Sequence, residues 1–214
     1  MKQRLFAVLA ALVLLTGCSA CAGGSVYAGR EFTFGSYEQD GNRSNGPEPI
    51  VWIVVDVDAA SGTCTAVSKY LLDCVQYHTS TATVSWHDTS LNRWLYSWFI
   101  PSAFSAGERT ALIPTRTGSS WEEVFIPSEE EMYRYFRGDY LCEPTRYAIS
   151  RGVYSVRYQG RICGSYWLRR NVSSTWGTFV GAHGGIYNQR NNKVTVTDNG
   201  VRPAITLSLY SFPF

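Results

Sequence analysis

The spacing of apolar side chains separates a leading segment from the rest of the chain. Residues 5–15 form an unbroken apolar run that follows the basic residues Lys2 and Arg4. A helix that spans a bilayer needs about 20 apolar residues, so this run is too short to cross a membrane and instead has the length of a signal-peptide core. We therefore expect residues 1–17 to be a secretory signal.

Polar and apolar residues alternate in the next part of the chain, which predicts β-strands. Two phenylalanines occupy alternate positions of residues 31–37, as in a strand with one buried face. Residues 50–55 and 64–72 are short runs rich in β-branched side chains, and residues 58–62 join them. This arrangement predicts a β-hairpin.

The apolar period lengthens after residue 88, which predicts helices. Asp88 can cap a helix that begins near Thr89 by accepting its free N–H groups. The apolar stripe of this helix consists of Leu91, Trp94, Leu95 and Trp98. Their i, i+3, i+4, i+7 spacing predicts that all four face the core. Capping boxes begin two further short helices at Ser105 and Ser128.

Strand patterns return in the last third of the chain, separated by Gly, Asn and Ser clusters. The predicted strands after the first helix are residues 124–126, 161–168, 178–181, 193–197 and 201–207. Strands, then helices, then strands without regular alternation predict an α+β fold. We expect a small twisted, mainly antiparallel sheet with two or three short flanking helices and long loops, formed by residues 30–214 as a single domain.

The end of the leading segment carries a cysteine at the expected cleavage point. Leu15-Thr16-Gly17-Cys18 resembles the lipobox of bacterial lipoproteins, in which this cysteine is lipidated. Several acyl chains hold a protein at a membrane more firmly than one chain does. The resemblance implies that Cys18 anchors the chain at the cell membrane or outer membrane, with residues 18–29 as an extracytoplasmic tether. The alternative is a secreted protein with a chance cysteine here.

The remaining cysteines would then lie in an oxidising compartment, which permits disulfides. Cys21 falls in the tether and has no evident partner. The candidates for disulfide formation are Cys64, Cys74, Cys142 and Cys163. Four cysteines allow three connectivities, so the sequence leaves open two disulfides or one disulfide with buried thiols.

Charge is distributed unevenly along a chain that is formally neutral once the signal is removed. Residues 144–197 contain eight basic and no acidic residues, whereas residues 18–143 contain 16 acidic and eight basic residues. One interpretation is that the two parts fold against each other and pair their charges. The other is a basic face for an anionic polymer such as an acidic glycan.

Short motifs in a fixed order resemble a known family. The motifs are Phe34-Gly35, Pro49-Ile50, Leu72-Asp73-Cys74, Ser90-Leu91, Trp94-Leu95, Ala103-Phe104-Ser105, Pro144-Thr145, Trp167-Leu168-Arg169 and Gly200-Val201-Arg202-Pro203-Ala204. Together they resemble the domain-of-unknown-function family 6273 of gut-bacterial surface and secreted proteins. No activity of that family is carried over to this chain.

The closing Gly-x-Arg strand of that family is similar to the end of the C-type-lectin-like and formylglycine-generating-enzyme-like folds. The resemblance implies a C-type-lectin-like architecture. By its residue type, Gly200 permits a turn, and we expect Arg202, before Pro203, to point inward and pair with a carboxylate. We interpret this motif as structural, with ligand binding by Arg202 as the alternative.

Catalytic and metal-binding patterns are weak in this sequence. The resemblance to formylglycine-generating enzymes would imply a copper-binding cysteine pair near the end of the fold, but no cysteine follows Cys163. The histidines His78, His87 and His183 are scattered and match no zinc motif. We expect no metal and no cofactor. A divergent enzyme with Cys142 or Cys163 as nucleophile is the alternative.

Aromatic and amide side chains alternate near the C-terminus, which favours a binding surface. Aromatic rings offer stiff contact area, and amides offer adaptable hydrogen bonds, as in surfaces that bind glycans or proteins. The candidate ligand-binding residues are Trp176, Tyr187, Asn188, Arg190 and Asn191, all in predicted loops. We therefore expect a non-catalytic surface module that binds a glycan or protein but no nucleic acid; a structural envelope component held by a protein partner is a further alternative.

Overall fold

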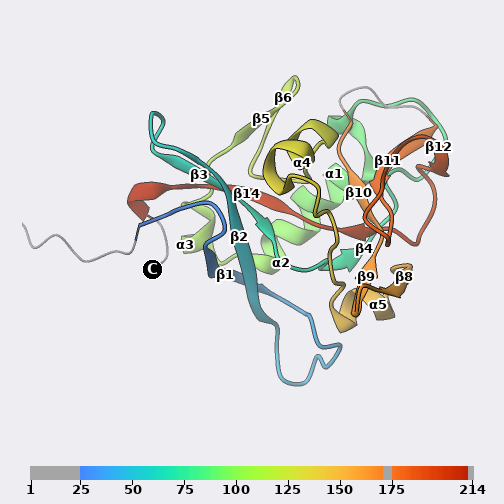
Figure 1. Ribbon diagram of the computed structural model, residues 1–214. Helices are drawn as coiled ribbons and strands as arrows, with labels where there is room; N and C mark the ends of the chain where they lie inside the picture. Colours follow the sequence, from blue (N-terminus) through green and yellow to red (C-terminus); the bar gives the residue numbers. More distant parts are fainter. Residues whose placement is uncertain (1–24, 171–174, 212–214) are drawn as a thin grey trace, which may run out of the picture.

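The computed structural model describes residues 25–170 and 175–211 of the 214-residue chain (Figure 1). The signal, Cys18 and most of the predicted tether lie outside these residues. The described part contains two five-stranded sheets and two two-stranded sheets, with short helices between them. The α+β class is confirmed, but the strands divide into two larger sheets rather than one small sheet.

The first sheet has the strand order β1-β2-β3-β14-β7. Its strands are β1 (Glu31–Tyr37), β2 (Glu48–Asp58), β3 (Thr63–Ser68), β7 (Val124–Phe125) and β14 (Ala204–Ser208). Alternate residues of β2, namely Ile50, Trp52 and Val54, are fully buried, as expected for a strand with one face on the core. The predicted strand at residues 31–37 and the predicted hairpin are confirmed as β1 and as β2–β3.

The second sheet has the order β12-β11-β10-β13-β4. Its strands are β4 (Asp73–Cys74), β10 (Tyr166–Leu168), β11 (Trp176–Val180), β12 (Ile186–Lys193) and β13 (Gly200–Val201). The β10–β13 pair is parallel, and the other strand pairs of the two sheets are antiparallel. The chain passes from the second sheet into the first at Arg202 and Pro203, between β13 and β14.

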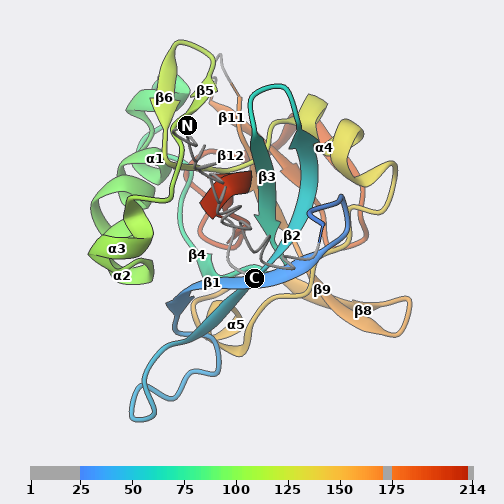
Figure 2. The ribbon, with the colours of Figure 1, turned by 90° about the vertical axis from the view of Figure 1, so that its left-hand side faces the viewer.

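Smaller elements lie around these sheets. The two-stranded sheets are β5 (Thr115–Thr117) with β6 (Ser120–Glu122) and β8 (Ser155–Tyr158) with β9 (Arg161–Gly164). The α-helices are α1 (Ser90–Trp94), α2 (Ile100–Ala103), α3 (Ala106–Arg109), α4 (Glu129–Phe136) and α5 (Arg146–Ser150). Figure 2 shows α1, α2 and α3 together on one side of the first sheet and α4 on the other.

A π-helical turn changes which face of the first helix is buried. The segment Leu95–Phe99 between α1 and α2 is π-helical. A π turn closes i→i+5 hydrogen bonds, so it holds an extra residue and shifts the faces that follow it. Phe99 is therefore fully buried and Trp98 is 60% exposed. The prediction that Trp98 faces the core is wrong, whereas Leu91 and Leu95 are buried as expected.

Helix N-termini follow the predicted capping chemistry with one change. The boxes Ser105/Glu108 and Ser128/Glu131 form as predicted at α3 and α4. Thr89, not Asp88, caps α1, because the Thr89 hydroxyl accepts the N–H of Asn92.

The predicted strands of the last third are only partly correct. Residues 161–168 divide at Ser165 into β9 and β10, and residues 194–197 lie beyond the end of β12. Residues 186–193 form β12 although no apolar alternation marks them. β12 is the edge strand of the second sheet and is held by backbone pairing with β11.

The main core fills the space between the sheets and helices α1 and α2. Its largest fully buried side chains include Trp52, Phe99 and Trp167. A second, smaller cluster around Met132, Tyr166 and Leu168 lies under α4. Among the described residues, the helices are too short or too polar to cross a membrane.

Candidate functional site

The C-terminal hairpin β11–β12 forms one wall of a surface hollow. Phe179 on β11 lies opposite Tyr187 on β12. The connecting turn is closed by two backbone hydrogen bonds, from the Gly181 N–H to the Gly185 carbonyl at 2.8 Å and from the Gly184 N–H to the Gly181 carbonyl at 2.8 Å. The hairpin therefore sets the position of Tyr187.

The hollow beside this hairpin has a volume of about 320 Å³, and we call it the hairpin pocket. Its lining includes Tyr154, Phe179, Tyr187, Asn192 and Asp198. Two of its aromatic side chains face solvent: Tyr154 is 53% exposed and Tyr187 is 40% exposed. A volume of this size is at the lower end of the range for small-molecule sites.

The ring of Tyr187 is held in place by its neighbours. It stacks on Phe179 with a centroid distance of 5.1 Å and an interplanar angle of 17°. Gly181 and Gly185 leave room for its edge, since a Cβ atom at Gly181 would lie 2.7 Å from the ring. Tyr187 can therefore present a fixed aromatic surface to a ligand with little loss of side-chain entropy.

Polar groups of the pocket are available for hydrogen bonding. The Tyr154 N–H donates to the Asp198 carbonyl at 2.7 Å, which holds the two residues together. Within the described part of the chain, the carboxylate of Asp198 and the amide of Asn192 make no hydrogen bond with another residue. The pocket thus combines exposed aromatic rings with a carboxylate and an amide, the groups that bind the face and the hydroxyls of a sugar.

Comparison with known proteins places the chain in a family. The model of a domain of unknown function (DUF6273) matches residues 61–209, which is more than half of the chain and includes the whole hairpin pocket. The chain belongs to this family. No curated protein and no solved structure matches it. The resemblance drawn from the ordered motifs is confirmed, although Phe34-Gly35 and Pro49-Ile50 lie before the matched DUF6273 region.

The structure separates the ligand-binding residues that the sequence groups together. Tyr187 lines the hairpin pocket. Asn188 follows it on β12 and therefore points to the opposite face, where its amide donates to the Glu129 carboxylate at 3.0 and 3.2 Å. Trp176 is paired with Lys193 at the far end of the hairpin and does not line the pocket. The side chains of Arg190 and Asn191 lie outside the described residues.

Sequence reasoning missed most of this pocket. Tyr154 and Asp198 lie more than 40 residues apart in the DUF6273 region, and no spacing or motif connects them. Asn192 lies in the aromatic and amide-rich segment near the C-terminus, next to the predicted ligand-binding residue Asn191. The backbone hydrogen bond from the Tyr154 N–H to the Asp198 carbonyl joins the residue before β8 to the segment after β12.

The predicted disulfides do not form. In the described residues of this DUF6273 domain, all four candidate cysteines are free and buried. The Cys74 thiol donates to the Thr197 carbonyl at 3.1 Å, and the Cys142 thiol donates to the Lys69 carbonyl at 3.4 Å. Cys74 and Cys142 therefore each have a hydrogen-bond acceptor in the core, and the expected disulfides are corrected to buried thiols.

Burial also sets the chemistry of these thiols. It raises the pKa of Cys64 and Cys142 to about 11 and that of Cys74 to about 12. The pKa of Cys163 is likewise raised by burial. Because the thiolate is the reactive form, these side chains are poor nucleophiles at neutral pH.

The Gly200–Pro203 motif has a different role from the predicted turn. A Cβ atom at Gly200 would lie 2.8 Å from the Leu71 side chain, so glycine is required here by close packing rather than by a left-handed turn. The Pro203 carbonyl accepts the Ser68 N–H at 2.8 Å, which joins the motif to the end of β3. Arg202 is buried as predicted, but it forms no ion pair with a described carboxylate.

A second hollow of about 560 Å³, the tryptophan pocket, lies beside the π-helical turn. Its lining includes the aromatic residues Trp94, Trp98 and Tyr147 and the arginines Arg43, Arg93 and Arg151. At its floor the buried Asp73 accepts hydrogen bonds from the Tyr37 hydroxyl at 2.7 Å and from Arg151 at 3.3 Å. Asp73 is therefore committed to structural contacts.

One acidic group among the described residues has the spacing of a metal site. Carboxylate oxygens of Glu38, Asp40 and Glu48 lie within 4.8 Å of one another. However, Glu48 accepts the backbone N–H of Gln39 at 2.7 Å, and Asp40 accepts the side chain of Asn45 at 2.9 Å. These bonds close the loop between β1 and β2, and we assign no metal to the group.

Proposed function

We propose that this protein is a lipid-anchored component of the bacterial cell envelope whose domain recognises a glycan in the hairpin pocket. The observation that carries the proposal is the fixed ring of Tyr187 beside an exposed Tyr154 in the hairpin pocket. The Asn192 amide and the Asp198 carboxylate lie in the same hollow and make no hydrogen bond with another described residue. A sugar ring stacks on an aromatic face, and its hydroxyls donate to a carboxylate and bond with an amide. Recognition of this kind needs no metal and no covalent step.

The anchor and the fold relation remain part of this proposal. Cys18 would carry the lipid, and residues 18–29 would connect it to the domain. The described chain enters the first sheet where the Gly29 N–H donates to the Val54 carbonyl at 2.7 Å, so the tether would end at this sheet. We also propose a C-type-lectin-like relation, which the closing Gly-x-Arg motif supports.

The alternatives are less well supported by the described chemistry. A cysteine enzyme needs an accessible thiolate, whereas burial raises the pKa of Cys142 to about 11. A structural component held by a protein partner would use an exposed apolar surface, for which Trp98, Tyr96 and Trp121 are the candidates. We propose no nucleic-acid partner.

A glycan array tests the proposal. The full chain with Cys18→Ser, which cannot be lipidated at this position, is screened at physiological salt with and without calcium. We expect saturable binding that is independent of calcium and at least tenfold weaker with Tyr187→Ala, because an aromatic contact contributes about 0.5–1.5 kcal/mol beyond its buried area. Asp198→Asn keeps the size of the side chain but removes its charge and should also weaken binding.

Tyr27→Ala is the matched control, because Tyr27 is 59% exposed and does not line the hairpin pocket. It should bind like the unsubstituted chain. Binding that is lost with Trp98→Ala but unchanged with Tyr187→Ala would move the site to the tryptophan pocket. Absence of glycan binding under both conditions would refute the glycan proposal.

A further inference from the structure

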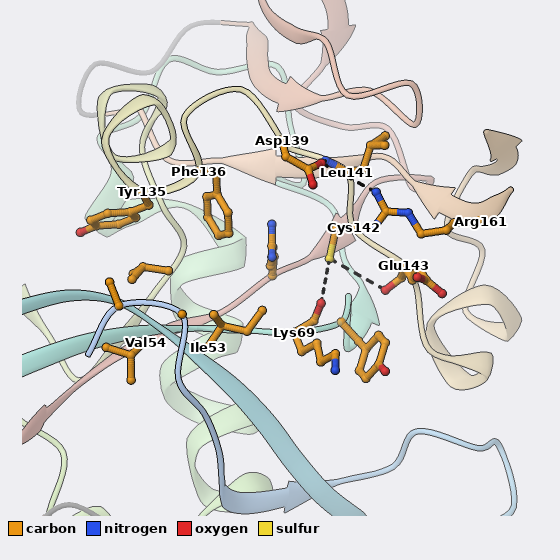
Figure 3. Close-up of a pocket in the computed structure, with 15 residues that line it drawn as sticks. Ile53, Val54, Lys69, Tyr135, Phe136, Asp139, Leu141, Cys142, Glu143 and Arg161 are labelled. Atoms are coloured by element: carbon orange, nitrogen blue, oxygen red, sulfur yellow. Dashed lines mark hydrogen bonds and ion pairs between the residues drawn. The ribbon is translucent and has the colours of Figure 1, made fainter. Parts of the chain in front are cut away.

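A third hollow, the arginine pocket, lies between β2, α4 and residues 139–143 (Figure 3). Its volume is about 470 Å³. The apolar side chains of Ile53, Phe136 and Leu141 form part of its wall, and Arg202 lines it as well. The hairpin pocket shares none of its lining residues. The two hollows are therefore separate features.

Arg202 lines this pocket with only 3% of its surface exposed, and its side chain is held by several contacts. Its Nε donates to the Ser68 carbonyl at 3.1 Å, and its Nη1 donates to the Tyr166 hydroxyl at 3.3 Å. The rings of Phe136 and Tyr166 lie 4.4 and 5.6 Å from the guanidinium carbon. Neutral groups and rings therefore position the guanidinium, and none of them cancels its charge.

A second buried arginine, Arg169, differs from Arg202 because it has a carboxylate partner. Arg169 is 4% exposed, and its Nη2 lies 2.6 Å from the Glu131 carboxylate. Within the described residues, Arg202 has no such partner within 4 Å. Arginine stays charged in proteins, and a buried charge without a counter-charge is costly. The two hydrogen bonds and the two aromatic faces offset part of this cost, and a carboxylate on a ligand would add the counter-charge that the described residues do not place within 4 Å.

The guanidinium has hydrogen-bonding capacity left for a ligand. An arginine side chain has five N–H groups, and the described residues accept two from Arg202. Its Nη2 makes no hydrogen bond with a described residue. Because Arg202 lines the hollow, these remaining N–H groups are the ones that a carboxylate can bind in a bidentate manner.

The charges around the pocket define the kind of anion that fits. The lining contains the cations Lys69, Arg161 and Arg202 and the acids Asp139 and Glu143. Lys69 is paired with Glu31 outside the lining at 2.8 Å, and Arg161 is paired with Asp139 at 3.8 Å. Of the three cations, Arg202 is the one without an ion pair among the described residues. A single carboxylate on the ligand can therefore pair with Arg202, whereas the second charge of a phosphate would face Asp139 and Glu143.

We propose that the arginine pocket binds a small molecule that carries one carboxylate on an apolar body. The carboxylate accepts hydrogen bonds from Arg202, and the apolar body packs against Ile53, Phe136 and Leu141. This site is independent of glycan binding in the hairpin pocket.

Isothermal titration calorimetry at pH 7 tests this assignment on the full chain with Cys18→Ser. The probes are sodium hexanoate, 1-hexanol and hexylammonium, which keep six carbons while the charge changes, and inorganic phosphate, which is an anion without an apolar body. We expect saturable hexanoate binding with a Kd of about 1 mM or below. Hexanol, hexylammonium and phosphate should bind at least tenfold more weakly.

Three variants separate the role of Arg202 from its effect on folding. Arg202→Met removes the charge and should abolish hexanoate binding. Ile53→Trp keeps Arg202, fills the pocket from a half-buried strand position and should also abolish binding, so it decides the question if Arg202→Met does not fold. Arg116→Met changes an exposed arginine on β5 outside the pocket and should leave binding unchanged.

Three results would overturn the proposal. The first is the absence of saturable hexanoate binding by the unsubstituted chain. The second is unchanged binding by Ile53→Trp or by folded Arg202→Met. The third is tighter binding of phosphate or hexanol than of hexanoate, because either would exclude a monocarboxylate as the preferred ligand.

Discussion

The π-helical turn predicts opposite effects for two neighbouring aromatic residues. Phe99 is fully buried, and its ring centroid lies 5.1 Å from that of Tyr37 and 5.6 Å from that of Trp94. Trp98, one position earlier, is 60% exposed. Truncation of each side chain to alanine therefore reports directly on which one faces the core.

The expected magnitudes differ by several kcal/mol. Phe99→Ala removes a fully buried ring and leaves a cavity, so it should lower the free energy of unfolding by about 3–5 kcal/mol. For a domain of this size that corresponds to a decrease in Tm of roughly 10 °C. Trp98→Ala removes an exposed ring and should change the free energy of unfolding by no more than about 0.5 kcal/mol.

Urea unfolding followed by far-UV circular dichroism measures both values without relying on tryptophan fluorescence. Tyr96→Ala is the control, because Tyr96 lies in the same turn and is 66% exposed. A large loss of stability with Trp98→Ala and a small one with Phe99→Ala would refute the π-turn register and restore the regular α-helical stripe.

Three further predictions follow from buried polar groups. Arg169→Met leaves the Glu131 carboxylate without its 2.6 Å partner and should destabilise the domain by about 2–4 kcal/mol in urea unfolding; a change below about 0.5 kcal/mol would show that the ion pair is not formed. Burial raises the pKa of Tyr77 and of Cys74 to about 12, above their ordinary values of 10.0 and 9.0, so the folded state retains these protons longer. Above about pH 9 the unfolded chain loses these protons before the folded chain does, so the stabilisation is complete below about pH 9 and is lost as the pH rises to about 12. Equal free energies of unfolding at pH 8 and pH 11 would contradict this prediction. Alkylation with iodoacetamide followed by mass spectrometry should leave the four buried thiols unmodified in the folded chain and modify them all in urea, whereas a mass that is two protons lower per cysteine pair would demonstrate disulfides.

Local sequence chemistry was sufficient to predict several helices and strands. The alternation of residues 31–37 defines β1, and the capping boxes at Ser105 and Ser128 define the starts of α3 and α4. These features depend on side chains within a few positions of each other. Their hydrogen bonds and burial pattern are therefore readable without knowledge of the rest of the fold.

Other elements depend on tertiary contacts. The strand β12 lacks apolar alternation, and its backbone pairing with β11 makes it a strand. The π turn that exposes Trp98 and buries Phe99 has no marker in the apolar spacing. In both cases the backbone does not follow from the apolar spacing of its own segment.

The candidate sites likewise combine features that the sequence indicates with features that only the tertiary structure sets. The sequence by itself indicated an aromatic and amide-rich C-terminal segment, and the structure retains Tyr187 from it. Only the tertiary structure joined Tyr187 to Tyr154 and Asp198, because backbone hydrogen bonds between remote segments bring these side chains together. Likewise, the sequence predicted a buried Arg202, but only the three-dimensional arrangement of carboxylates shows that, among the described residues, Arg169 has an ion-pair partner and Arg202 has none. Charge pairing depends on distances between residues that are far apart in the chain, and the linear order of residues does not contain those distances.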